Sequence, residues 1–111
     1  MPELSVVVST HNRPILLRKS IQSLIDQSLG ASFYEIIVAD SYSENNGIAN
    51  DDVIKNLQKD YPNHNIIYFY EKVKGGYTHT RNQAIKKANG ELIVCGDDDF
   101  IANPNYLESC V

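Results

Sequence analysis

The sequence predicts an α/β fold in which an open, mostly parallel sheet lies between helices on both of its faces. Short apolar runs alternate with amphipathic stretches along the whole chain of 111 residues, which is the order expected of successive strand–helix units. The first run, residues 4–9, is rich in β-branched residues and nearly all apolar, as in a strand buried on both faces. The length fits one small domain.

Four short apolar runs are predicted to be strands, because each is followed by polar residues where a strand would end. They span residues 4–9, 34–39, 65–70 and 91–95. Between them, apolar residues recur at the spacing of a helix face; Leu17, Ile21 and Leu24 are an example. Helices are therefore expected over residues 14–29, 51–59 and 78–89, and from Pro104 onward.

Composition limits the possible functions. The net charge of −4 gives no broad attraction to nucleic acid. No run reaches the ~18 apolar residues of a membrane span, and the N-terminus lacks a signal-peptide pattern. We therefore expect a cytoplasmic protein. Peripheral association of the full protein with the inner face of the membrane is the alternative. Cys95 and Cys110 lack the spacing of a zinc site and are predicted to be buried free thiols.

Polar clusters follow each predicted strand, and in such sheets ligands bind beyond the carboxyl ends of the strands. All four clusters are therefore expected at one edge of the sheet. They comprise Thr10-His11-Asn12, Asp40-Ser41, Lys74-Gly75-Gly76 and Asp97-Asp98-Asp99. The sequence thus predicts a binding site at that edge.

The acidic triplet at residues 97–99 is the strongest candidate for metal binding. Three adjacent carboxylates repel one another unless a cation relieves them, and carboxylate oxygens suit Mg²⁺ or Mn²⁺. Asp97 and Asp99 could share a side if strand geometry persists. The alternative is a solvated acidic turn before the next helix, but the position at the binding edge favours a metal.

Each of three other residues at this edge has two possible roles. Asp40 could accept hydrogen bonds from a base or a ribose, or it could hold its loop as a turn residue. His11 could stack on a base, or it could be a surface residue. Arg81 could pair with a diphosphate, or form a salt bridge with the triplet. The glycines at 75 and 76 match neither a Walker motif nor a dinucleotide motif.

Together these segments resemble family 2 glycosyltransferases, in order and over nearly the whole chain. The matching segments are residues 4–13, residues 35–43, residues 75–84 and residues 88–99. Two positions depart from the family pattern: His11 stands where an aromatic residue, commonly Tyr, is usual, and Ser41 where a second acid or amide is usual. The resemblance implies a GT-A fold, a Rossmann-like three-layer sandwich, here incomplete. Residues 1–111 would be the N-terminal donor-nucleotide-binding part of the enzyme.

The resemblance also implies partners and site residues. The chain would bind a nucleoside-diphosphate sugar, with a UDP-sugar expected, and Mn²⁺ or Mg²⁺ as cofactor. The metal would be held by Asp97, Asp98 and Asp99. The nucleotide would be bound by Thr10, His11, Asn12, Asp40, Gly75, Arg81 and Asp97. The catalytic residue is unknown, since the family's base is expected beyond Val111.

The favoured hypothesis is therefore a donor-site domain for inverting hexosyl-type transfer to an unknown acceptor, in polysaccharide or glycoconjugate biosynthesis. A non-catalytic nucleotide-binding fragment is the first alternative, and a sugar-phosphate nucleotidyltransferase is the second. The terminal helix is expected to expose an apolar patch that favours self-association. That patch would consist of Tyr106, Leu107, Cys110 and Val111.

Overall fold

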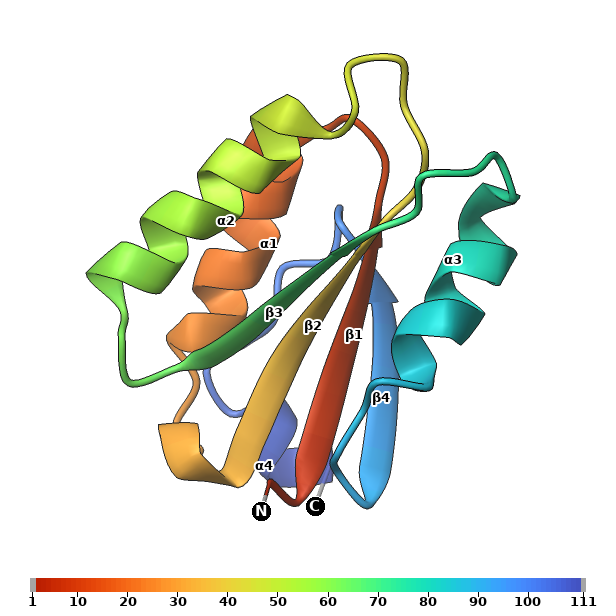
Figure 1. Ribbon diagram of the computed structural model, residues 1–111. Coiled ribbons are helices and arrows are strands. Elements are labelled where there is room, and N and C mark those ends of the chain that lie inside the picture. The colour runs from red at the N-terminus through yellow and green to blue at the C-terminus, as the bar shows by residue number, and fades with distance from the viewer. Residues whose placement is uncertain (1, 111) are drawn as a thin grey trace.

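The computed structural model describes residues 2–110, without the side chain of Tyr77, and confirms the predicted α/β fold. Its four strands form one parallel sheet in the order β3-β2-β1-β4 (Figure 1). The strands are β1 (Leu4–Thr10), β2 (Tyr34–Asp40), β3 (Asn65–Tyr70) and β4 (Leu92–Asp97). From β1 the chain passes outward through β2 to β3, and it then returns to place β4 on the other side of β1. The strand order therefore changes direction between β1 and β4. Such a switch point opens a crevice at the carboxyl edge.

Helices cover both faces of this sheet, as expected. Figure 1 shows α1 and α2 on one face and α3 on the other, with the short α4 at the far end from the carboxyl edge. The helices are α1 (Pro14–Ile25), α2 (Ile48–Asp60), α3 (Gly76–Ile85) and α4 (Tyr106–Cys110), and a 3₁₀ turn, η1, spans Ala31–Phe33.

The alternation of side chains along the strands divides the core into two clusters. Val6 and Val8 face α1 and α2, where Leu17, Ile21 and Ile54 join them in the larger cluster. The neighbouring odd-numbered strand residues face α3, where Val7, Ile37 and Ala39 form a smaller cluster with Ala84 of that helix. Every residue of β1 and β2 is buried, which confirms the expectation for the first strand. These two strands therefore anchor the loops that follow them.

A buried carboxylate fastens the opposite, amino-terminal edge of the sheet. Glu35 Oε2 accepts hydrogen bonds from Ser5 Oγ at 2.6 Å and from the Asn89 backbone N–H at 2.7 Å. Gly90 N–H donates to the same Ser5 hydroxyl at 2.8 Å. A Cβ on Gly90 would lie 2.6 Å from the backbone of Leu4, so the turn before β4 packs directly on β1.

Helix boundaries differ from the predicted ones at several places. α1 ends at Ile25, before Gly30, and Gly30 instead precedes the 3₁₀ turn. α2 begins at Ile48, since Gly47 adopts φ +69° and turns the chain into the helix. α3 ends at Ile85, so Ala88 packs on the sheet from outside the helix.

β4 is more exposed than a strand buried on both faces, because within residues 2–110 it pairs with β1 alone. Cys95 is consequently exposed, and the prediction that it is buried is wrong; Cys110 is partly buried. The prediction of an exposed apolar patch on α4 is also wrong at Leu107, because this side chain is fully buried in the larger core cluster. Val111 lies outside the described residues.

None of the helices within residues 2–110 is long and apolar enough to span a membrane.

Candidate functional site

The sheet register brings three of the predicted polar clusters to one level at the carboxyl edge. Thr10, the last residue of β1, is paired with Asp40 at the end of β2. Ser9 is paired with Asp97 at the end of β4. The backbone N–H of Ser41 donates to the Thr10 carbonyl oxygen at 3.0 Å, which continues the β1–β2 pairing into the loops. The acidic triplet and the Asp40 turn therefore flank the end of β1.

The middle aspartate of the triplet points into the protein. Asp98 is 1% exposed, and its Oδ2 accepts a 2.8 Å hydrogen bond from Thr10 Oγ1. Its Oδ1 lies 3.4 Å from Nη1 of Arg13, and its backbone N–H donates to the Ser9 carbonyl oxygen at 3.0 Å. A buried carboxylate is tolerated when donors and a cation satisfy it. Asp98 thus joins the loop after β4 to the loop after β1.

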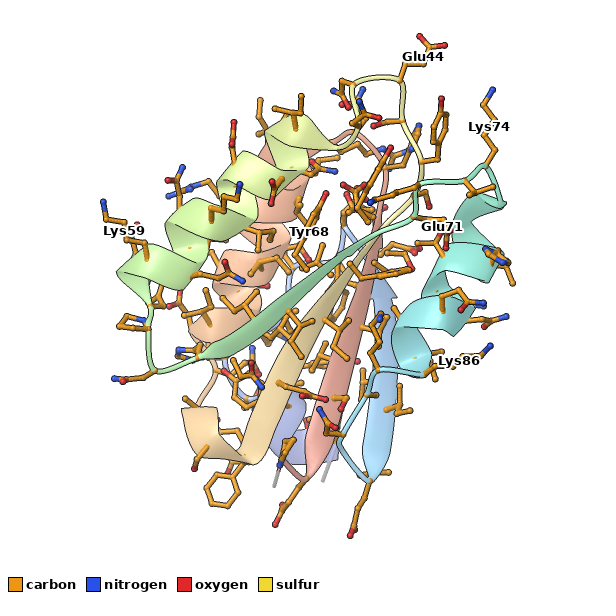
Figure 2. All side chains as sticks on the ribbon, in the orientation of Figure 1. Glu44, Lys59, Tyr68, Glu71, Lys74 and Lys86 are labelled. Carbon is orange, nitrogen blue, oxygen red and sulfur yellow. The ribbon has the colours of Figure 1, made fainter. Side chains whose placement is uncertain are left out.

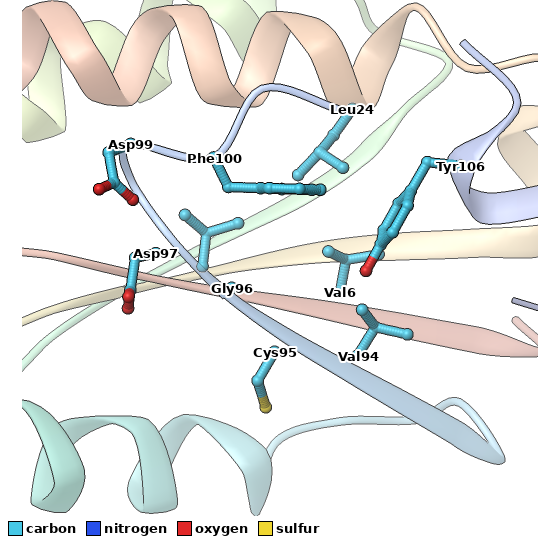
Figure 3. A pocket seen from close by; sticks show the side chains of 10 residues that line it. Val6, Leu24, Val94, Cys95, Gly96, Asp97, Asp99, Phe100 and Tyr106 are labelled. Carbon is cyan, nitrogen blue, oxygen red and sulfur yellow. The ribbon is translucent and has the colours of Figure 1, made fainter. Parts of the chain in front are cut away.

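The two flanking aspartates are exposed. Figure 3 shows the carboxylates of Asp97 and Asp99 on the same side of the loop that follows β4. Together with Arg13 and Asp98, they line an open hollow of about 330 Å³. The structure therefore separates the triplet into one inward and two outward carboxylates, although the sequence prediction treated all three as ligands. Metal binding by each of them stays a prediction.

Within residues 2–110, no group of three or more His, Cys, Asp or Glu side chains is placed to hold a metal ion by itself. Mg²⁺ and Mn²⁺ commonly take only one or two protein carboxylates together with water and substrate phosphate, so a site of that kind would not form such a group.

Asp40 is fully buried, unlike Asp97 and Asp99. Its Oδ2 accepts a 2.5 Å hydrogen bond from the Tyr68 hydroxyl, and its Oδ1 accepts one of 3.2 Å from Asn50 Nδ2. Burial raises the pKa of Asp40 above its ordinary value, while these hydrogen bonds and the nearby His11 act in the opposite direction. The same burial, with the bond to Asp40, raises the pKa of Tyr68.

A glycine closes the space above the Asp40 carboxylate. A Cβ on Gly47 would lie 2.7 Å from the Tyr68 hydroxyl oxygen and 2.8 Å from Asp40 Oδ2. The Gly47 N–H donates to Ser43 Oγ at 3.0 Å, so the loop is folded tightly over the strand end. The Asp40 carboxylate therefore joins the end of β2 to α2 and β3, and its predicted role as a turn residue is not seen among its described hydrogen bonds. Its contact with a nucleoside stays a prediction.

The sequence did not single out Tyr68 and Asn50, the two residues that support Asp40. A signal for Tyr68 was present: a tyrosine in a buried strand needs a partner for its hydroxyl, and Asp40 ends the neighbouring strand. Asn50 lies on α2, and its proximity to Asp40 depends on how that helix packs.

Two hollows lie beside His11, over the loops that follow β1, β2 and β3. The larger has a volume of about 560 Å³ and is lined by His11, Asn12, Tyr42, Ser43, Glu44, Asn45 and Lys74. The smaller, of about 230 Å³, is lined by His11, Ser41, Tyr42, Lys74, Gly75 and Gly76. Figure 2 shows Lys74 and Glu44 projecting from the tips of these loops.

The walls of these hollows combine rings, a cation and hydrogen-bonding groups. Lys74 Nζ lies 5.5 Å from the centroid of the Tyr42 ring, and Asn45 Nδ2 donates to Asn12 Oδ1 at 3.0 Å. Asn12 itself adopts φ +48°, which asparagine tolerates better than most residues. Flat rings beside amide and ammonium groups suit a ligand with a planar ring and negative charge.

The structure does not bring every predicted residue to the hollows. Gly75 lines the smaller one and packs closely on His79, whose Nδ1 lies 3.6 Å from Glu71 Oε2. Arg81 lies part-way along α3, partly buried. Among the described residues that line the hollows above, Arg81 is absent.

An apolar hollow of about 270 Å³ lies below the acidic triplet, on the side of β4 that faces α1 (Figure 3). Val6 and Val94 form part of its floor. Phe100 and Tyr106 pack edge to face above them, with ring centroids 5.0 Å apart. Phe100 directly follows the Asp97–Asp99 loop, and its carbonyl oxygen accepts a 2.7 Å hydrogen bond from Ser20 of α1. The loop is therefore anchored on both sides.

Comparison with models of known protein families assigns the chain to a family. The family model "Glycosyl transferase family 2" matches residues 5–111, which is nearly the whole chain. The chain belongs to glycosyl transferase family 2. This agrees with the resemblance seen in the sequence motifs and favours the glycosyltransferase hypothesis over the nucleotidyltransferase alternative.

Curated relatives of this family 2 chain are glycosyltransferases. The GalNAc(5)-diNAcBac-PP-undecaprenol beta-1,3-glucosyltransferase of Campylobacter jejuni is 39% identical over 100 residues, which cover 89% of this chain and 30% of the relative. The poly(ribitol-phosphate) beta-glucosyltransferase of Bacillus spizizenii is 32% identical over 107 residues, covering 95% of this chain and 16% of that protein. The chain thus spans less than a third of the length of these relatives.

Solved glycosyltransferase structures share the fold, which is of the GT-A type. A mannosyltransferase from Pyrobaculum calidifontis, PcManGT, in complex with GDP-Man and Mn²⁺, superposes with a TM-score of 0.79 at 26% identity, over 88% of this chain and 28% of that one. The S. aureus TarS 1-349 structure with UDP-GlcNAc gives a TM-score of 0.80 at 26% identity, over 99% of this chain and 30% of that one. The predicted Rossmann-like GT-A fold is thereby confirmed.

Proposed function

We propose that this family 2 chain is the donor-binding part of a glycosyltransferase that takes a UDP-sugar and a divalent metal ion. The observation that carries the proposal is the pairing of two outward carboxylates, Asp97 and Asp99, with ring-lined hollows beside His11 at the same sheet edge. A nucleoside diphosphate has matching chemistry, with a planar base at one end and phosphates at the other. The complexes of related structures with GDP-Man and Mn²⁺, and with UDP-GlcNAc, support the same assignment.

The metal would be Mn²⁺ or Mg²⁺, held by Asp97 and Asp99. Both carboxylates are exposed, and their oxygens are hard ligands of the kind these ions prefer. When bound, such an ion offsets negative charge on the diphosphate leaving group. Asp98 would position this pair from within, since its own carboxylate is held by Thr10 and Arg13.

The nucleoside would lie toward the loops after β1 and β2. His11 and Tyr42 offer rings there, and Lys74 offers a cation to the phosphates. Thr10 and Asp40 would act from beneath, because both are fully buried at the strand ends from which these loops leave. Asn12 and Gly75 line the hollows directly. A role for Arg81 in nucleotide binding remains a prediction from the sequence motif.

Transfer itself would join an acceptor hydroxyl oxygen to the anomeric carbon as the bond from that carbon to the diphosphate breaks. Attack from the opposite side inverts the configuration. The acceptor proton would pass to a carboxylate base. Because the chain spans less than a third of its relatives' length, we propose that the base and the acceptor site lie in the remainder of the full protein. The acceptor is therefore unassigned.

Calorimetry of the 111-residue chain with UDP tests this proposal. We expect UDP to bind in the presence of Mn²⁺ and at least about tenfold more weakly with a chelator, because a lost charge-assisted contact costs over 1.4 kcal/mol. Asp97→Asn and Asp99→Asn should each reduce the effect of Mn²⁺. Asp60→Asn, at the exposed far end of α2, is the matched control and should bind like the parent chain. Equal UDP affinity with and without Mn²⁺ would exclude the metal assignment.

A further inference from the structure

Half of the positive charges of this acidic protein are gathered in one segment. Residues 72–90 hold five of the ten Lys and Arg residues and none of the fourteen Asp and Glu residues. This segment therefore carries a formal charge of +5, while the other residues together carry −9. It comprises α3 and most of the connections on either side of that helix. Such a separation of charge gives the molecule a positive side, which an anionic surface attracts.

The lysines of this segment lie on the surface. Lys72, Lys74, Lys86 and Lys87 are all exposed, and none of them takes part in the ion pairs found among residues 2–110. Figure 2 shows Lys74 beside the start of α3 and Lys86 at its end, both projecting away from the sheet. Their charges are therefore available to a partner outside the chain.

The two sides of the molecule differ in the signs of the charges that they expose. Figure 1 shows α3 alone on its face of the sheet, and the acid that precedes the segment, Glu71, is turned toward His79 with Oε2 3.6 Å from Nδ1. On the opposite face, α2 exposes Asp52 and Asp60 together with its lysines. Only the α3 side thus presents a run of one sign.

An apolar side chain lies among these lysines. Val73 is 68% exposed and stands between Lys72 and Lys74 in the loop before α3. The boundary between lipid headgroups and acyl chains accepts apolar side chains beside cations, whereas a soluble polyanion offers nothing to a valine. α3 itself exposes polar residues such as Thr78 and Asn82, so the helix would lie on a membrane surface without entering it. These features favour a lipid surface over a soluble polyanion.

We propose that the α3 side of this chain, from Lys72 to Lys87, docks reversibly on a membrane surface rich in anionic phospholipids. The exposed lysines approach the lipid phosphates, and Val73 enters the headgroup layer. Lys74 borders both this surface and the hollows beside His11, so docking brings the carboxyl edge of the sheet close to the lipid. The inference does not depend on the proposed function, because Lys72, Lys86 and Lys87 line none of the hollows described above.

Co-sedimentation of the chain with lipid vesicles tests the inference. In about 0.1 M salt we expect binding to vesicles of equal parts phosphatidylglycerol and phosphatidylcholine, and none to vesicles of phosphatidylcholine alone. About 1 M salt should release the bound chain, because screening then acts over about 3 Å. The triple variant Lys72→Gln/Lys86→Gln/Lys87→Gln should bind the anionic vesicles at least about tenfold more weakly, since each lysine near such a surface contributes roughly fivefold.

A matched variant controls for net charge. Arg18→Gln/Lys19→Gln/Lys59→Gln removes three charges from exposed positions on α1 and α2 and should bind vesicles like the parent. Equal losses in the two triple variants would show that overall charge governs binding and would overturn the inference. Absence of binding to the anionic vesicles, or equal binding to both kinds of vesicle, would overturn it too. Both variants should keep the parent's affinity for UDP, so the proposed function is tested separately.

A soluble polyanion is the competing partner, and Val73 separates the two. Val73→Ser should weaken vesicle binding about two- to fivefold, because an apolar side chain no longer leaves water on docking. The same variant should bind inorganic polyphosphate as the parent does. If the parent binds polyphosphate but not vesicles, or if Val73→Ser binds vesicles as tightly as the parent, the surface serves a soluble polyanion and the lipid assignment is wrong.

Discussion

Thr10 Oγ1 donates a 2.8 Å hydrogen bond to Oδ2 of Asp98, two residues that are 88 positions apart in the sequence. Both side chains are buried. The bond joins the end of β1 to the loop that follows β4, and it turns one of three consecutive carboxylates inward. Asp97 and Asp99, its neighbours in the sequence, are left exposed. This contact therefore helps to fix the loop after β1 relative to the acidic loop.

Replacing Thr10 should test that dependence. Thr10→Val keeps the shape of the side chain but leaves Asp98 Oδ2 buried without its donor, at a cost of roughly 1–3 kcal/mol in the free energy of unfolding. Thr10→Ser retains the hydroxyl and should restore most of the lost stability. Urea unfolding measures the first effect, and Mn²⁺-dependent UDP binding should weaken in the valine variant alone. Equal stability of the valine and serine variants would show that the bond contributes little.

Asp40 should behave as a buried group whose charge works against folding. Its folded pKa lies above the ordinary value of 3.8, so the native state favours the protonated form and loses stability as pH rises through that folded pKa. Asp40→Asn removes this loss and should be at least as stable as the parent near pH 7. Asp40→Ala leaves the Tyr68 and Asn50 donors without their acceptor and should cost about 1–3 kcal/mol. Urea unfolding at several pH values checks both expectations.

The same two Asp40 variants test the nucleoside contact expected from the sequence. If Asp40 contacts the nucleoside, Asp40→Ala should weaken binding of UDP more than binding of pyrophosphate. The asparagine variant then separates two causes, because it preserves the packing of the loop under Gly47 but lacks the charge. UDP affinity that is lost in the alanine variant and kept in the asparagine variant would mean that Asp40 acts through the loop.

Two glycines with positive φ should differ in their tolerance of alanine. At Gly76, φ is +80° and the added Cβ would meet no atom within 4 Å, so Gly76→Ala should cost about 1 kcal/mol from backbone strain alone. At Gly47, φ is +69° and the Cβ would collide with Tyr68, Asp40 and Tyr70. Gly47→Ala should therefore cost roughly 2–4 kcal/mol. Thermal unfolding of the two variants side by side checks the order, and an equal loss would contradict the close packing over Asp40.

Glu35 should make the free energy of unfolding depend on pH in the acid range. Burial alone would raise its pKa, but the hydrogen bonds from Ser5 and Asn89 outweigh burial and lower the pKa below the ordinary value of 4.5. Its contribution is therefore complete above pH 4.5 and is lost as pH falls through the folded pKa. Glu35→Gln should lower stability by about 1–3 kcal/mol near pH 7, and the difference should shrink in acid. Glu91→Gln, at an exposed site, is the control; a difference that does not change with pH would contradict this account.

The fold class and the gathering of polar clusters at one edge of the sheet could be predicted from local patterns. Each strand is indicated by a short apolar run, and in a parallel sheet the residues that follow the strands lie at one edge. The clusters at Thr10, Asp40 and Asp97 were expected there for that reason, and the register confirms that the strands bearing them end together. The exposure of Cys95 was not predictable in this way, because an apolar strand looks the same in sequence whether it lies at the centre or at the edge of a sheet.

The sequence by itself determined that this is an α/β protein with acidic, glycine-containing and polar loops at one edge, since periodicity and turn residues are local properties. Only the tertiary structure decided which carboxylates are available to a ligand. Asp40, Asp98, Asp97 and Asp99 are chemically alike, but Tyr68 and Asn50 enclose the first, and Thr10 and Arg13 hold the second. Those partners come from other elements of the fold, and the burial of a charge depends on everything packed around it.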